Sequence, residues 1–323
     1  MLLMNSIKIL FSNFTVVWKV LLYKIICLAL AAILMIVIVW PQISGILTAL
    51  SNEGLFMNFR AVVSSILSID INGVSDTIVA FNNSFERSLE IIAKSGISFA
   101  LVYISAILIY CVYRFLNGLL ELPLFEVIDF NLNSCAKLPI TSTYLKNFKK
   151  SSLYSLHLLL FSLVFDILMV LAIWFLAQVL FIWFSFFAVF FLFTILVLLF
   201  AFRSTLFSMW KPIMIVNNEG IMKSFKKGLR ITFKNFGRLF SHFIVMFFLT
   251  FFINLVVAFF TCGAGLILSI PSSFFLFAIF QMVYYFSYKR KKYYTDGDTI
   301  VQSRLDHTMP DLGIKQDEND EEI

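Results

Sequence analysis

Residues 151–202 read SSLYSLHLLLFSLVFDILMVLAIWFLAQVLFIWFSFFAVFFLFTILVLLFAF, and Asp166 is the only Asp, Glu, Lys or Arg among them. As a single helix this stretch would be about 75 Å long at 1.5 Å per residue, whereas the hydrocarbon core of a bilayer is about 30 Å thick. Residues 239–288 form a second stretch of similar length with no charged residue. Each stretch is therefore expected to be a hairpin of two membrane-spanning helices, with turns near Ala177–Val179 and at Thr261–Gly265.

Two further apolar stretches lie closer to the N-terminus, at about 17–40 and 96–114. The first contains Lys19 and Lys24 near its start, where long side chains can extend to the headgroups. It is too long for the apolar region of a typical signal peptide and has no small-residue cleavage site nearby, so we expect it to remain as a span. The sequence predicts an all-α, polytopic membrane helix bundle over residues 1–292. Its six spans are expected at about 17–40, 96–114, 153–176, 179–202, 241–261 and 265–288.

The composition excludes a water-soluble globular protein. Hydrophobic residues make up 60% of the 323 residues and charged residues only 14%, whereas a soluble domain has about a quarter charged residues. The formal net charge of +6 is explained by basic loops at a membrane surface, so no nucleic-acid partner is expected. The bilayer itself, with anionic headgroups, is the expected partner.

The basic residues are unevenly distributed among the loops, which predicts the orientation. Residues 114–152 contain five Lys or Arg residues, residues 203–238 contain eight, and residues 289–292 read KRKK. The loop at 41–95 has three basic and five acidic residues. By the positive-inside rule, both termini are cytoplasmic and 41–95 is an extracytoplasmic loop of a protein in the cell (inner or plasma) membrane. Within that loop, Leu55–Leu67 and Thr77–Ala93 are expected to form short amphipathic helices.

The C-terminal segment 293–323 is polar, contains nine acidic residues and ends in DENDEEI. Such a composition buries too little apolar surface to offset the entropy lost on folding. We therefore expect a disordered acidic cytoplasmic tail, which is available for contact with a membrane or cytoplasmic protein partner.

Short similarities recur before the first, third and fifth spans and indicate an internal repeat. Asn-Phe occurs at 13–14, 147–148 and 235–236, each time shortly before a span. Arg114 precedes Pro123 by nine residues, and Arg203 precedes Pro212 by nine residues. These spacings favour three repeated helical hairpins of the same orientation, which differ from the inverted repeats of many transporters.

Asp166 and Asn254 are the polar candidates inside the membrane. They fall at matching positions of the second and third repeats. A charge at the bilayer centre costs about 2.5–3.5 kcal/mol on insertion scales, so Asp166 should have a partner or face water. One hypothesis is an ion or substrate contact. The alternative is an interhelical hydrogen bond between the third and fifth spans.

The segment Gly220–Phe240 has the pattern of a basic amphipathic helix lying in the inner headgroup region. Its apolar residues recur at helical spacing, and its basic residues recur on another face. Attraction to anionic lipid is the simpler interpretation, and a docking surface for a cytoplasmic protein is the alternative. The apolar set is Ile221, Phe225, Leu229, Phe233, Phe236 and Phe240. The interfacial basic set is Arg114, Arg203, Lys223, Lys227, Arg230, Lys234 and Arg238.

The sequence contains none of the motifs that would indicate an enzyme. It has no zinc-binding HExxH, no GxSxG elbow and no phosphate loop,. Its four cysteines are widely separated, so neither a metal site nor a cofactor is expected. Glu121, Glu126 and Asp129 are expected to be solvated loop charges.

Arg203, Pro212 and the basic segment Gly220–Phe240, with an echo at Arg114–Phe148, resemble a broad group of uncharacterised bacterial six-span proteins. That group is similar to the membrane domain of some glycerophosphodiester phosphodiesterases. The resemblance implies a fold and a membrane location but no catalytic residue. These features favour a non-enzymatic scaffold, assembly or envelope-maintenance component, and the main alternative is a small-solute or ion transporter or channel. A membrane-embedded enzyme that acts on lipid is a third, less favoured class.

Overall fold

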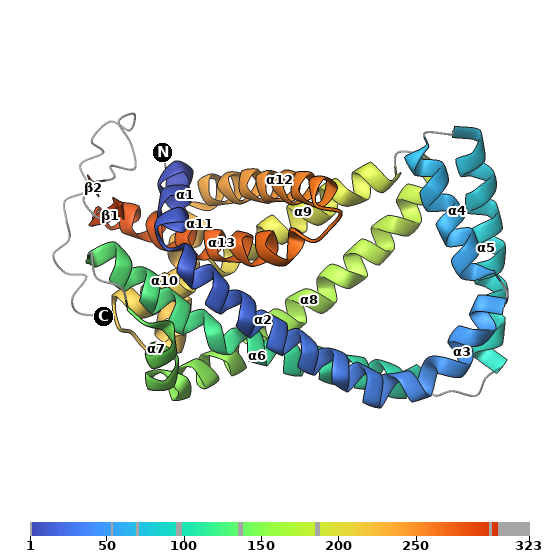
Figure 1. Cartoon of the computed structure of the whole chain (residues 1–323), viewed down its shortest axis with the longest axis horizontal. Coiled ribbons are helices and arrows are strands. Elements are labelled where there is room, and N and C mark those ends of the chain that lie inside the picture. The colour runs from blue at the N-terminus through green and yellow to red at the C-terminus, as the bar shows by residue number, and fades with distance from the viewer. Residues whose placement is uncertain are drawn as a thin grey trace.

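The computed structural model describes residues 2–52, 54–68, 71–94, 99–134, 138–184, 188–296 and 299–302. Six helices in these ranges are long and apolar enough to cross a membrane. Figure 1 shows them close together on the side of the N-terminus and spread apart toward the opposite end of the molecule. The predicted six-span, all-α polytopic fold is thus confirmed. The membrane-crossing helices are α2 (Phe14–Leu34), α6 (Phe99–Asn133), α8 (Phe148–Phe184), α9 (Ala188–Phe207), α12 (Phe236–Phe260) and α13 (Leu266–Tyr288).

The ends of several spans differ from the prediction. Helix α6 continues past Arg114 to Asn133 with Pro123 inside it. Helix α8 continues to Phe184, so the turn predicted near Ala177–Val179 is wrong and the chain reverses after Phe184. The second predicted turn is confirmed, because residues 261–265 separate α12 from α13. There Cys262 and Gly263 have φ values of +50° and +88°.

The first span leads into a group of helices at one end of the bundle. Helix α2 passes through a π-helical turn, η1 (Met35–Val39), into α3 (Trp40–Asn52). Helices α4 (Leu55–Leu67) and α5 (Ile71–Lys94) follow and pack on each other. The sequence predicted α4 with these bounds, and α5 is longer than the predicted Thr77–Ala93. Figure 1 shows α3, α4 and α5 far from the N-terminus.

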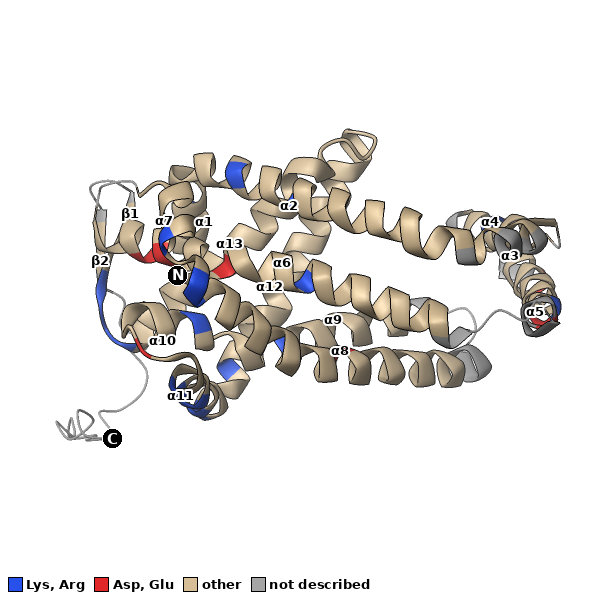
Figure 2. Cartoon of the chain, turned by 90° about the horizontal axis from the view of Figure 1, so that it is seen from below, with Lys and Arg blue, Asp and Glu red and all other residues tan. Residues whose placement is uncertain are grey.

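The opposite end of the bundle contains short elements and most of the charge. These elements, which we call the basic end, lie together in Figure 1. Figure 2 shows Lys and Arg concentrated in this half of the molecule. The basic end consists of α1 (Leu2–Ser12), α7 (Ile140–Lys146), α10 (Trp210–Val216), α11 (Ile221–Lys234) and the hairpin of β1 (Lys292–Asp296) and β2 (Thr299–Gln302).

The hairpin corrects part of the predicted disordered tail. Strands β1 and β2 pair antiparallel, with Tyr293 opposite Val301. The Tyr293 side chain is buried, and its hydroxyl accepts a hydrogen bond of 2.8 Å from Asn5 in α1. An Asp-Gly pair at 296–297 between two β-prone runs is a hairpin signal that the composition argument overlooked,. The remainder of the predicted tail, 303–323, lies outside the described residues.

The internal repeat has a structural counterpart at each Asn-Phe pair. Asn13, Asn147 and Asn235 separate a short helix at the basic end from the span that follows. Each Asn side chain donates a hydrogen bond of 3.0 Å to the backbone carbonyl four residues earlier. The same carbonyl also accepts the backbone N–H of the Asn, so the side-chain bond reinforces the last turn of the short helix. The chain can then change direction and begin a new helix at the following Phe.

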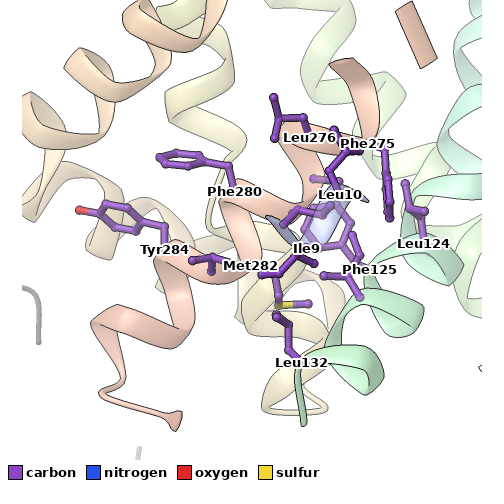
Figure 3. Packing of buried hydrophobic residues seen from close by; sticks show 14 of the residues in the cluster. Ile9, Leu10, Leu124, Phe125, Leu132, Phe275, Leu276, Phe280, Met282 and Tyr284 are labelled. Carbon is purple, nitrogen blue, oxygen red and sulfur yellow. The ribbon is translucent and has the colours of Figure 1, made fainter. Parts of the chain in front are cut away.

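Helix α13 lies at the centre of the packed core. Half of the residues in its apolar stretch are buried, compared with 11–22% in the other spans. Figure 3 shows Ile9 and Leu10 of α1 together with Leu124 and Phe125 of α6 around α13. Large apolar side chains on the outer helices remain exposed in the isolated chain, for example Leu22, Val164 and Phe259. Such exposure is expected for faces that contact lipid tails.

Candidate functional site: a polar network inside the bundle

Glu121 lies at the centre of a buried network of charged side chains. It is on α6 and only 4% exposed. Its carboxylate is 3.0 Å from the ammonium of Lys211 and 4.0 Å from the guanidinium of Arg114, and it accepts a hydrogen bond of 3.1 Å from the Tyr154 hydroxyl. The prediction of solvated loop charges is wrong for all three acids, because α6 does not end at Arg114 but continues to Asn133. Glu121 is buried in the bundle, and Glu126 and Asp129 are partly buried on the same helix.

A close helix contact holds this part of the network together. A Cβ atom at Gly118 of α6 would lie 2.3 Å from the hydroxyl oxygen of Ser155 in α8. The Ser155 hydroxyl donates a hydrogen bond of 2.5 Å to the backbone carbonyl of Phe115. Only glycine permits this approach, which brings α8 and the adjacent Tyr154 against Glu121.

Lys24 of α2 is the third cation near Glu121. Its ammonium donates a hydrogen bond of 2.6 Å to Asn117 in α6 and lies 4.0 Å from the centre of the Phe274 ring in α13. Asn117 is one helical turn before Glu121 on α6, so Lys24 lies beside the Glu121 group. The sequence predicted that Lys24 extends to the headgroups, but in the structure its side chain lies between α6 and α13.

Asp166 forms a second group in the network. Its carboxylate is 2.7 Å from Nε of Arg203 on α9 and accepts a hydrogen bond of 3.2 Å from Nη2 of the same guanidinium. The Tyr110 hydroxyl of α6 donates to the same carboxylate. Asp166 therefore joins α6, α8 and α9, and Arg203 lies inside the bundle beside it. Arg114 also donates a hydrogen bond of 3.5 Å to Ser162, which lies one helical turn before Asp166 on α8.

Asn254 lies elsewhere in the bundle. It donates a hydrogen bond of 3.4 Å to Ser273 and so joins α12 to α13. The predicted pairing of the third and fifth spans through Asp166 and Asn254 is therefore not the arrangement found. The prediction that Asp166 needs a partner agrees with the structure, but the partners are Arg203 and Tyr110.

Helix α11 has a different buried face from the one the sequence suggested. Its buried residues are the small side chains Ser224, Gly228 and Thr232. A Cβ atom at Gly228 would lie 3.1 Å from the backbone nitrogen of Trp210, so α11 packs closely on α10. Of the predicted apolar stripe, Phe225 packs against Trp210 with its ring tilted by 57°, whereas Phe233 is 63% exposed.

The basic residues of α11 are mostly exposed. Lys223, Arg230 and Lys234 are exposed and Arg238, just beyond the helix, is partly buried. Lys227 forms an ion pair of 2.8 Å with Glu219. Burial raises the pKa of Glu219, but hydrogen bonds from Lys227 and Asn217 outweigh this effect and leave its pKa below the usual value,.

The network contains more cations than carboxylates. In the ranges that the structure describes, no three His, Cys, Asp or Glu side chains gather as a metal site would require. Its charged groups are four cations and two carboxylates: Lys24, Arg114, Lys211 and Arg203 with Glu121 and Asp166. Such a group can bind an anion or hold helices together.

Comparisons of the chain with protein-family models, with curated proteins and with solved structures gave no match.

Proposed function

We propose that the protein is a non-enzymatic scaffold, assembly or envelope-maintenance component of a bacterial cell membrane, with both termini cytoplasmic. The observation that carries this proposal is the closed ion pair of Asp166. Both oxygens of its carboxylate are used, because Arg203 contacts each of them and Tyr110 donates to one. A charged group that holds three spans together performs a structural task.

The same observation weighs against transport. A carboxylate that binds a passing ion or solute needs free acceptor capacity and access to water. Asp166 meets neither requirement well, since it is paired on both oxygens and its side chain is 19% exposed. A transporter or channel remains the competing class and defines the opposite outcome of the experiment below.

The basic end supports the proposed orientation. The exposed residues Lys223, Arg230 and Lys234 lie on α11, and each basic residue near an anionic leaflet contributes about 1 kcal/mol of attraction. Cytoplasmic leaflets carry this negative charge. The basic end therefore faces the cytoplasm in this proposal, and α3, α4 and α5 face the outside. A cytoplasmic or membrane protein partner would approach the same end.

Thiol labelling in membranes tests whether the bundle interior is dry. Asn254→Cys and Ser273→Cys are introduced with Cys27, Cys111 and Cys135 replaced by Ala, and a membrane-impermeant thiol reagent is applied from either side. The native Cys262, which is exposed in the turn between α12 and α13, serves as the positive control. We expect labelling of Cys262 and none at positions 254 or 273. Labelling at position 254 that a solute protects would support a transporter instead.

Isolation in mild detergent tests the scaffold itself. A full-length tagged protein should retain a stoichiometric partner through purification, and charge reversal of the exposed α11 residues (Lys223→Glu with Arg230→Glu) should reduce its recovery. If the tagged protein is purified without any other protein, the scaffold proposal is contradicted.

A further inference from the structure

Three cations around Glu121 share a single carboxylate. Lys211 is the direct partner at 3.0 Å, and Arg114 is at 4.0 Å. The Lys24 ammonium donates its hydrogen bond to the neutral Asn117, which lies one helical turn before Glu121 on α6. The side chains of Arg114 and Lys211 are only 20% and 13% exposed, so water screens their charges poorly.

The remaining polar neighbours do not supply negative charge. Tyr154 and Asn117 are neutral, and the rings of Phe274 and Phe125 lie near Lys24 and Lys211 at 4.0 and 5.0 Å. The second carboxylate, Asp166, is occupied by Arg203. Counting Lys24, Arg114 and Lys211 against Glu121 gives three positive charges and one negative charge. A buried net charge of this size is costly unless an anion accompanies it.

We propose that Lys24, Arg114 and Lys211 bind a phosphate group, supplied by the headgroup of an anionic phospholipid. Phosphate fits this set because a guanidinium offers a planar pair of N–H donors and an ammonium offers three donors. Lys24 uses one donor on Asn117. Arg114 lies at a long distance from Glu121, so its guanidinium retains donors for an anion.

The depth of the cluster favours a lipid as the source. Trp40, which is 54% exposed, has the character of an interfacial residue at the far end of the first span. Lys24 lies sixteen residues before it, which is at most about 24 Å, because the π-helical turn η1 lies between them,. In a hydrocarbon core of about 30 Å, Lys24 is then at least about 6 Å from the edge nearer the basic end. A lipid phosphate reaches this level with a small inward displacement.

Ligand-dependent thermal unfolding of the purified full-length protein in neutral detergent tests the site. The probes are dihexanoyl phosphatidylglycerol, dihexanoyl phosphatidylcholine and inorganic phosphate. We expect phosphatidylglycerol to raise Tm saturably. Phosphatidylcholine should have little effect, because the three cations repel the choline ammonium beside its phosphate. Lys24→Gln and Lys211→Gln should each raise the apparent Kd for phosphatidylglycerol by about tenfold, as the loss of a charge-assisted hydrogen bond predicts.

Lys8→Gln is the matched control, because Lys8 is exposed on α1 at the same end of the molecule. It should bind phosphatidylglycerol like the unchanged protein. If inorganic phosphate at equal concentration is as effective as the lipid, the phosphate site stands and its source is free phosphate. If neither anion acts saturably, or if Lys24→Gln and Lys8→Gln respond alike, the proposal is overturned. Glutamine at position 24 retains a hydrogen bond to Asn117, so folding of that variant is expected.

Discussion

Glu121 and Glu126 lie on the same helix, α6, but in different surroundings. The Glu121 side chain is 6% exposed and has Lys211 and Arg114 as ion-pair partners. The Glu126 side chain is 26% exposed and lies 3.7 Å from Lys146, which is itself 77% exposed. Because Glu121 is buried, loss of any one partner leaves an uncompensated buried charge. The Glu126–Lys146 pair is screened by solvent, so its loss costs little.

We therefore predict different effects of the same substitution at these two positions. Glu121→Gln leaves Lys24, Arg114 and Lys211 without their carboxylate, and should lower the free energy of unfolding by about 3–5 kcal/mol. Glu126→Gln should change it by less than about 1 kcal/mol. Thermal unfolding of both variants in the same detergent measures the difference. Similar Tm values for the two variants would contradict the network described here.

Glu219 provides a pH-dependent prediction at the basic end. Its pKa is lowered in the folded protein, since its hydrogen bonds from Lys227 and Asn217 outweigh the opposing effect of burial. A depressed pKa means that the carboxylate stabilises the fold above its unfolded pKa, and that this contribution is lost as the pH falls through the folded pKa. The Tm difference between the unchanged protein and Glu219→Gln should thus be present at pH 7 and vanish below the usual range of a glutamate. A difference that is independent of pH would exclude the Glu219–Lys227 pair as its cause.

At the level of the elements, the contact between α6 and α8 depends on a glycine. A Cβ atom at Gly118 would lie 2.3 Å from the Ser155 hydroxyl, whereas one at Gly237 in α12 would meet nothing within 4 Å. Gly118→Ala should destabilise the protein by about 1–3 kcal/mol, as overpacking does. Gly237→Ala should be neutral or stabilising, because alanine is the better helix former. If both variants unfold at the same temperature, α6 and α8 are not packed as closely as described.

Helix existence could be predicted from the sequence more reliably than helix length or orientation. Apolar runs bounded by charge predicted six spans, and the helical segment Leu55–Leu67 was predicted with its observed bounds. The end of α6 was not predictable from the charge of Arg114, because a charged residue ends a span only when it reaches water. In this fold Arg114 instead interacts with Glu121 and Ser162 inside the bundle.

The polar network was predictable only in part for a related reason. The cost of a charge in lipid indicated that Asp166 needs a partner, but it did not identify which helix supplies one. Arg203 was expected at the membrane surface, yet it is the partner. Which face of a helix turns inward depends on neighbours that lie far away in the sequence, such as α8 against Gly118. The Asn-Phe pairs, by contrast, act locally, and each Asn makes the same bond to the fourth preceding residue. The three-hairpin repeat that they indicate stays a prediction.

At the level of the whole molecule, charge and apolar surface are arranged along one axis. The basic end contains α1, α7, α10, α11 and the hairpin, and the helices α3, α4 and α5 lie at the other end (Figure 1). Between them, the outer spans present apolar side chains such as Leu22 and Val164. This distribution matches a chain that crosses a bilayer along its long axis and presents one strongly basic surface to an anionic leaflet.

Single cysteines at the two ends of this axis test the proposed orientation. Ser64 is exposed on α4 and Lys226 is exposed on α11, and each is replaced by Cys in a chain that lacks its native cysteines. In intact cells an impermeant maleimide should label Ser64→Cys, because residues 41–95 are expected outside. It should label Lys226→Cys only after the membrane is permeabilised, since the positive-inside rule retains the basic loops in the cytoplasm. The reverse pattern would place α11 outside the cell. Helix α11 could then not contact the anionic cytoplasmic leaflet. Because the phosphate-binding cluster lies nearer the basic end, it would then also draw its lipid from the outer leaflet.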